Sequence, residues 1–209
     1  MSERPGIWTG GTLPAGSTSA SVREFAAAEG WTLEDDQPRT VAGPRYWLWR
    51  APEGQAGLIE DHRTGLRYVE ARPASFTVRL AAALRLESVA DLLDRARTAA
   101  GPLERMRALR ALALGQHTAA YEAAATAPED QDHPGYALLP DDPRYLEAFE
   151  RALDDPAPGV RRAGVDGLAY GPWPGSREIL RRRRDDLPQF AELIEEQLNG
   201  EPTRFRKYG

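Results

Sequence analysis

Residues 153–168 read Leu-Asp-Asp-Pro-Ala-Pro-Gly-Val-Arg-Arg-Ala-Gly-Val-Asp-Gly-Leu, and this stretch decides the architecture that we expect. Its two prolines stop one helix and favour the start of the next, because proline fixes φ and lacks a backbone donor. Asp155 can accept backbone N–H bonds in the turn, and Arg161 is placed to pair with turn carboxylates. The small residues Ala163 and Gly164 permit close approach of a neighbouring helix. The stretch therefore predicts two helices joined by a tight turn.

The chain around this turn has a helical hydrophobic period from residue 75 onward. Pro102 opens a helix that Gly115 should end, and Asp142 should cap a helix that begins at Pro143. Ser88 can cap a further helix, and Ser176 can cap the helix over 177–184. The other expected helices cover 76–84, 118–127, 160–170, 177–184 and 188–199, with a long polar loop over 128–142.

Helix pairs at intervals of roughly 35–45 residues indicate stacked repeats. The stretch 153–168 resembles the HEAT-repeat signature, in which an apolar helix is followed by a D-P-x-P-x-V-R-x-x-A turn and a second helix that ends near Leu-Gly. The segment that begins at Pro102 is similar to the second helix of another repeat but lacks that turn. The resemblance extends over residues 75–199 and implies two or three repeats.

What the HEAT resemblance implies is a scaffold with an extended surface, which in most such proteins binds other proteins. A minority bind nucleic acid or carry out chemistry, such as the HEAT-like DNA alkyl-purine glycosylases. Those enzymes use an acidic residue with aromatic neighbours to hold a damaged nucleotide, which makes Asp166 the one candidate catalytic residue, with Tyr170 and Trp173 nearby. The alternative is an exposed aspartate on a helix, followed by a loop tryptophan that packs on the next repeat.

The N-terminal part has a different period. Residues 1–20 are rich in Gly, Ser, Thr and Pro, which is typical of a flexible lead-in. A short helix over 21–30 precedes strands over 45–50, 57–62 and 66–71, and a further strand can begin at 31–33. We therefore expect an α+β fold with four regions: a lead-in over 1–20, a small domain of one helix and an antiparallel meander over 21–74, HEAT-like helices over 75–199 and a basic tail over 200–209.

Trp47 and Trp49 alternate along one strand, so both side chains lie on the same face of the sheet. That face either packs in the core or forms an exposed aromatic patch for recognition. A third alternative is a pocket for a small molecule or peptide where the meander meets the helices, lined by one of these tryptophans.

The charge of the chain argues against a protein that coats DNA, because its formal net charge is −5 and its pI is about 5.4. Of its 27 basic residues all but Lys207 are arginine, which suits forked pairing with carboxylates or phosphates but is also typical of a GC-rich genome. The run 181–184 lies at a helix end, where the dipole favours cations, and it is followed by two aspartates. It is expected either to pair locally or to contact phosphate or an acidic protein. The candidate binding arginines are Arg161, Arg162, Arg181 and Arg184.

Several classes of site are excluded or disfavoured by the residues present. The absence of cysteine excludes disulfides and thiolate metal sites. His62, His117 and His133 lie in separate elements without a zinc spacing, and the acidic residues over 129–142 lack the spacing of an EF-hand. Residues 11–18 match the spacing of a phosphate-binding loop, but Ser17 replaces its lysine. We expect no cofactor and no metal.

The N-terminal residues lack a basic start and an apolar run, and no window approaches the length of a membrane span, so a cytoplasmic protein of bacterial type is expected. The sequence favours a non-enzymatic protein-binding module, such as an adaptor or an immunity-type scaffold. The alternatives are a nucleic-acid-binding or base-excision protein, and a binder of a small molecule or peptide.

Overall fold

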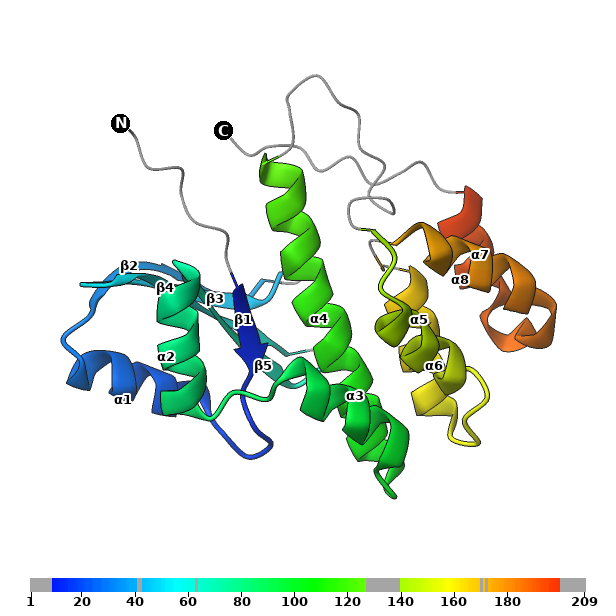
Figure 1. Cartoon of the computed structure of the whole chain (residues 1–209), viewed down its shortest axis with the longest axis horizontal. Helices are drawn as coiled ribbons and strands as arrows, with labels where there is room; N and C mark the ends of the chain where they lie inside the picture. The colour runs from blue at the N-terminus through cyan, green and yellow to red at the C-terminus, as the bar shows by residue number, and fades with distance from the viewer. Residues whose placement is uncertain are drawn as a thin grey trace. The chain divides into compact units, whose positions relative to one another are not determined.

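The computed structural model describes residues 9–40, 43–62, 64–126, 140–169, 171 and 173–199, without the side chains of residues 9 and 117–126. The chain divides into two compact units, residues 1–89 and 90–209 (Figure 1). The first combines a sheet with helices and the second is helical, which confirms the expected α+β class. The division between the units falls after residue 89 rather than after 74.

The first unit is built on an antiparallel sheet in which the strands follow the order β1-β5-β4-β3-β2. The last four strands in sequence form the expected meander, with Trp47 paired to Leu58 and Leu58 paired to Val69. The bounds of the strands are β1 Thr9–Thr12, β2 Thr32–Gln37, β3 Arg45–Ala51, β4 Gly54–Asp61 and β5 Leu66–Arg72.

Strand β1 corrects the expectation of a flexible lead-in over residues 1–20 for the part that the structure describes, which begins at residue 9. Gly11 pairs with Val69, and the Thr12 carbonyl accepts the backbone N–H of Glu87 at 2.8 Å. A Cβ on Gly10 would lie 2.1 Å from the Val69 carbonyl oxygen, so only glycine allows this approach. The two glycines offset the strand preference of the two threonines, so the local signal is weak, and β1 forms by pairing with the backbone edge of β5.

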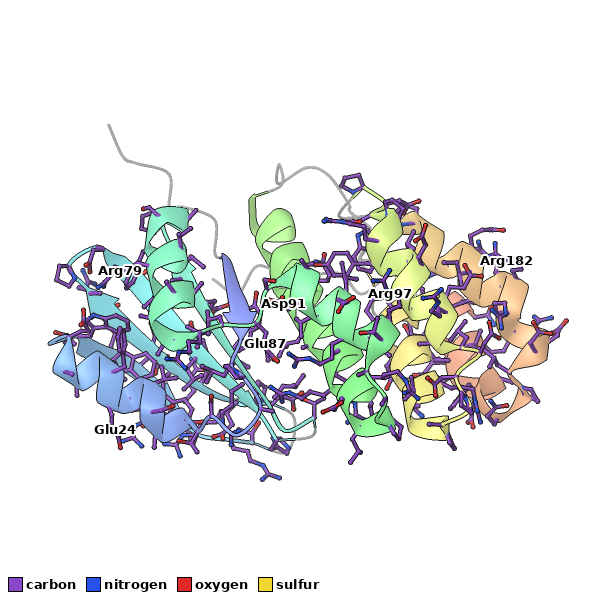
Figure 2. All side chains as sticks on the ribbon, turned by 60° about the horizontal axis from the view of Figure 1, so that its bottom comes forward. Glu24, Arg79, Glu87, Asp91, Arg97 and Arg182 are labelled. Atoms are coloured by element: carbon purple, nitrogen blue, oxygen red, sulfur yellow. The ribbon has the colours of Figure 1, made fainter. Side chains whose placement is uncertain are left out.

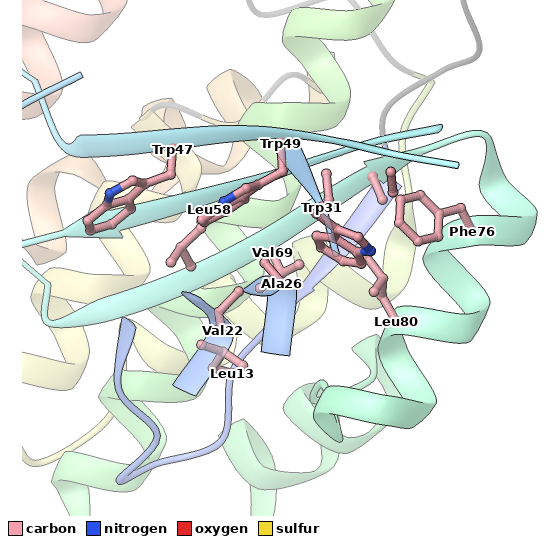
Figure 3. Packing of buried hydrophobic residues seen from close by; sticks show 13 residues of the cluster. Leu13, Val22, Ala26, Trp31, Trp47, Trp49, Leu58, Val69, Phe76 and Leu80 are labelled. Atoms are coloured by element: carbon pink, nitrogen blue, oxygen red, sulfur yellow. The ribbon is translucent and has the colours of Figure 1, made fainter. Parts of the chain in front are cut away.

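Helices α1 (Ser19–Ala28) and α2 (Ala74–Leu84) cover one face of the sheet and enclose the core of the first unit (Figures 1 and 3). Phe76 and Leu80 of α2 are buried in that core, so this helix belongs to the sheet and not to the helical repeats to which the sequence assigned it. Trp31 packs edge-on against Phe25 and Phe76, with ring centroids 5.5 and 5.4 Å away.

The second unit consists of helices joined in part by short turns, and its central element is α6. Helix α6 packs most extensively against α4, α5 and α7, and it also contacts α8. The turn between α5 and α6 is the one that the two prolines predicted, and Asp142 caps α5 by accepting the N–H of Arg144 at 3.0 Å. The bounds are α3 Val89–Thr98, α4 Pro102–Thr126, α5 Pro143–Ala152, α6 Pro158–Ala169, α7 Pro174–Arg183 and α8 Ala191–Asn199, with single 3₁₀ turns over 184–186 and 188–190.

Two expected helix ends are wrong. Gly115 does not end a helix, because α4 continues through it to Thr126; an interior glycine costs only about 1 kcal/mol relative to alanine, which neighbouring turns can offset. Ser176 does not cap α7, which begins at Pro174, and its side chain is fully buried within the first turn. In both cases the residue type favours a boundary locally but the surrounding helix continues.

The contact between α5 and α6 depends on two glycines. A Cβ on Gly164 would lie 2.9 Å from the Cβ of Ala152, and a Cβ on Gly167 would lie 2.2 Å from Cε1 of Phe149. Phe149 is fully buried, so its ring cannot move into solvent to make room. The close approach that the sequence predicted for this helix is therefore confirmed.

We predict that Gly167→Ala lowers the free energy of unfolding by about 2–3 kcal/mol, because the added methyl group overpacks the core against Phe149. The matched control is Gly159→Ala in the first turn of the same helix, where the nearest atom to the new Cβ is the flexible Met106 Sδ at 3.2 Å. Urea unfolding followed by circular dichroism measures both. Equal effects of the two substitutions would contradict the packing argument.

Candidate functional site

A groove of about 710 Å³ lies within the second unit, between α3 and α5. Each helix lines it over two turns, or about 10 Å of helix length. The pair α3–α5 is not among the close helix contacts of this unit, whereas α4–α6 and α5–α6 are. The lining residues are Ala90, Leu93, Asp94, Ala96 and Arg97 from α3, and Arg144, Glu147, Ala148, Glu150 and Arg151 from α5.

The groove combines an apolar part with a charged rim. Its apolar residues are one leucine, Leu93, and alanines from both helices, so its walls carry few bulky side chains. Its charged residues are three acids and three arginines, so the formal charge of the lining is zero. Figure 2 shows Arg97 on the side of α3 that faces α5. Such a lining suits a partner that is itself both apolar and charged.

Four of the six rim charges already have partners. Arg97 donates to Asp94 at 2.8 Å, Arg144 to Asp142 at 2.7 Å, and Arg182 of α7 to Glu150 at 2.6 Å. The side chains of the remaining two, Glu147 and Arg151, form no hydrogen bond or ion pair with any residue that the structure describes. They lie four residues apart on α5, one helical turn from each other.

A buried ion pair connects the turns at the ends of the two helix pairs. Arg105 of α4 donates to both oxygens of Asp155, at 2.8 and 3.1 Å, and also to the carbonyls of Ala99 and Ala100. Asp155 accepts the N–H of Ala157 at 2.9 Å as well, which confirms its expected role in the turn. Both side chains are at least four-fifths buried, so this pair holds the α3–α4 turn against the α5–α6 turn.

Arg161 differs from its expected role. Its guanidinium donates to the backbone carbonyls of Asp155 and Pro156, at 2.7 and 3.0 Å, and not to a turn carboxylate. The carboxylate is taken by Arg105, which lies fifty residues away in the chain. Burial by itself raises the pKa of Asp155, but the hydrogen bonds from Arg105 and Ala157 outweigh it and hold that pKa below its usual range.

The structure places both strand tryptophans in the core of the first unit. Trp47 is 2 % exposed and Trp49 is 5 % exposed, and both side chains lie among Leu58, Val69 and the covering helices (Figure 3). Their placement corresponds to the core alternative, and neither presents a face for recognition. The alternation along the strand predicted that the two tryptophans share one face of the sheet. Which face the helices cover depends on tertiary packing.

The two described residues of the base-excision alternative, Asp166 and Trp173, are engaged in contacts within the fold. Asp166 accepts a 2.7 Å hydrogen bond from Arg162 one turn earlier on α6. Trp173 is 1 % exposed and packs against Tyr145 and Phe149, with ring centroids 5.1 and 6.3 Å away. Tyr170 lies outside the described residues. A buried indole offers no free ring face to a flipped base.

The arginine run 181–184 is paired with carboxylates throughout. Arg181 lies 3.4 Å from Glu178, and Arg184 lies 2.9 Å from both Asp185 and Glu195. Arg182 donates to Glu150, and Arg183 reaches Asp154 and Asp186. The carboxylates around the run outnumber its arginines, so a phosphate approaching it meets negative charge.

A tyrosine–glutamate pair lies on the sheet face opposite α1 and α2. The Tyr46 hydroxyl donates to Glu70 Oε1 at 3.2 Å, and the buried Gly57 leaves the space that both side chains use. Burial raises the pKa of Tyr46, and the charge of Glu70 raises it further. The tyrosine therefore stays protonated near neutral pH and acts as a hydrogen-bond donor to the carboxylate.

The remaining candidates give no site in the part of the chain that is described. No group of three or more potential metal ligands occurs among the described residues, while His133 and most of the acidic loop lie outside them. The phosphate-loop spacing of residues 11–18 covers the end of β1 and the loop before α1, where Thr18 accepts the N–H of Ser21 as the helix cap. None of the described helices is long and apolar enough to cross a membrane.

Sequence reasoning missed the groove between α3 and α5. No candidate named from the sequence lines it, because its residues are alanines and ordinary surface charges. The one local signal is the pair Glu147 and Arg151, a spacing that also occurs on any exposed helix face. Comparisons with protein-family models, curated proteins and solved structures return no match for this chain.

We predict that Asp155→Asn destabilises the fold by about 1–3 kcal/mol at pH 7, because it removes charge-assisted hydrogen bonds from a buried position. The pKa of Asp155 is lower in the folded chain than the value of about 3.9 in an unfolded chain. The carboxylate therefore stabilises the fold above about pH 4, and this contribution is lost as the pH falls further through the folded pKa.

Denaturant unfolding at pH 7 and near pH 3 measures this difference. The difference in the free energy of unfolding between wild type and Asp155→Asn should be smaller at the lower pH. Asp185→Asn, at an aspartate whose side chain is 84 % exposed, is the matched control and should change stability little at either pH. A gap that stays constant with pH would rule out the charge as the origin of the effect.

Proposed function

We propose that this protein is a non-enzymatic protein-binding module whose second unit is a short stack of HEAT-like repeats. The observation that carries the proposal is the groove between α3 and α5, whose lining combines Leu93 and three alanines with charges of both signs. A mixed rim around an apolar centre is the usual composition of a protein–protein interface. An adaptor or an immunity-type scaffold fits this chemistry.

The arrangement of the helices supports the repeat part of the proposal. The helices follow one another as α3 and α4, then α5 and α6, then α7 and α8, and α6 lies at the centre of the packing (Figure 1). Arg105 and Asp155 connect the turn of the first pair to the turn of the second. A stack held by contacts between neighbouring pairs leaves an extended surface for a partner.

The nucleic-acid alternative has less support from the described geometry. Binding to a phosphate backbone requires arginines that are free to neutralise phosphates, which releases the counterions condensed on the nucleic acid. The arginines of the run 181–184 and Arg162 are instead engaged by carboxylates. A partner protein with its own charged and apolar side chains is the better match.

The test is a pull-down of the tagged full chain from lysate of the native organism, with and without nuclease, read by mass spectrometry. We expect a stoichiometric protein partner that survives nuclease and reassociates with the protein after purification. Recovery that disappears with nuclease, together with salt-dependent binding of purified duplex or single-stranded DNA, would replace the proposal with the nucleic-acid alternative.

A further inference from the structure

The groove between α3 and α5 has features that restrict what can occupy it. Both walls are α-helices, so the groove has no strand edge, and backbone groups away from the end turns are paired along each helix axis. An extended peptide placed there would find no backbone partners for its own N–H and C=O groups, which is costly in a partly dry site. A helical segment brings its backbone already satisfied, so helix-in-groove binding is the mode that suits these walls.

The side chains of the groove restrict the occupant further. Ala90, Ala96 and Ala148 keep the walls low, and Leu93 provides the one larger apolar contact. Low walls allow a helix to approach closely, and a helix that approaches closely must itself present small or aliphatic residues at spacings of three and four. Two turns of lining match about two turns of such a stripe.

The rim charges specify the flanks of the occupant. Glu147 and Arg151 are the two rim charges left without a partner among the described residues. A bound helix that covers the groove can satisfy them with a basic residue opposite Glu147 and an acidic residue opposite Arg151. The zero net charge of the lining disfavours a polyanion, and the aliphatic groove floor favours a peptide side chain over a phosphate.

We infer that the α3–α5 groove receives one amphipathic helix of a partner protein, whose Ala- and Leu-type face packs on Leu93 and whose flanks pair with Glu147 and Arg151. This inference rests on the proposed protein-binding function and specifies the surface that carries it.

The test uses three synthetic 15-residue peptides, held helical by side-chain lactam bridges, with the same Ala/Leu stripe. Their flanking positions are all glutamine, all lysine or all glutamate. Fluorescence anisotropy measures their binding to the full chain. The variants are Glu147→Arg, which leaves two positive unpaired charges, and Arg151→Glu, which leaves two negative ones, so the result is independent of the direction in which the peptide lies.

We expect the wild type to bind all three peptides, with Glu147→Arg favouring the glutamate peptide over the lysine peptide by at least about threefold and Arg151→Glu reversing that preference. The glutamine peptide should bind the three proteins equally. Failure of every peptide to bind the wild type, or the same preference order in both charge variants, would overturn the inference.

The apolar contact is tested by Leu93→Asp, which should weaken all three peptides by at least about tenfold. Leu103→Asp is the matched control, because Leu103 lies in the same unit, outside the groove, and is 73 % exposed. Ala90→Arg, at an exposed position of α3, blocks the groove without touching the core and serves if Leu93→Asp fails to fold. Equal losses with Leu103→Asp would refute the site.

Further outcomes distinguish a failure of this inference from a failure of the proposed function. If the partner from the native lysate is retained equally by wild type, Leu93→Asp and Ala90→Arg, protein binding stands and the groove is refuted as its site. If sedimentation shows a dimer that Leu93→Asp dissociates, the occupant is a second copy of this chain and the inference is overturned. Peptide binding without any native partner would refute the proposed function and, with it, the partner helix that this inference names.

Discussion

The second unit depends on the close contact between α5 and α6. Gly167 lies under the ring of Phe149 and Gly164 lies against Ala152, so these two helices approach more closely than side chains with a Cβ would allow. The same helix α6 also packs against α4 and α7. A change in the α5–α6 distance therefore shifts every neighbouring helix at once, because packed interiors have no free volume to absorb it.

The groove is a consequence of that packing. Helices α4 and α6 are in close contact and α5 is held against α6, while the Arg105–Asp155 pair anchors the turns of both helix pairs. Nothing comparable draws α3 to α5, and the alanines along them leave the space between them open. The same tight contacts that stabilise the unit thus leave a groove that is partly apolar and is bordered by two charged side chains without a partner among the described residues.

The arginine content of the chain has a structural explanation within the described residues. The guanidinium groups of Arg105 and Arg161 bond backbone carbonyls in two turns, and those of the run 181–184 join α7 to the acidic residues of α5 and α8. A planar guanidinium can pair with both oxygens of a carboxylate and still donate to a carbonyl, whereas the compact ammonium of lysine lacks this planar fork. Pairing of this kind consumes the positive charge that a polyanion would need.

Part of this structure could be predicted from the sequence, because it depends on interactions between residues that are close in the chain. The cap at Asp142, the prolines before α6 and the alternation of Trp47 and Trp49 act within a few residues, so their consequences for helix starts and strand faces follow from the sequence alone. The sequence likewise marked Gly164 as a point of close helix approach.

Other features depend on residues that are distant in the chain, and only the tertiary structure decided them. Strand β1 forms because it pairs with β5. Helix α2 packs on the sheet because Phe76 is buried in the core of the first unit. The carboxylate of Asp155 pairs with Arg105 rather than with Arg161. The groove between α3 and α5 is of the same kind, since no short-range pattern reveals which two helices will remain apart. Burial and pairing are sums over many long-range contacts, and a local pattern of residue types does not contain them.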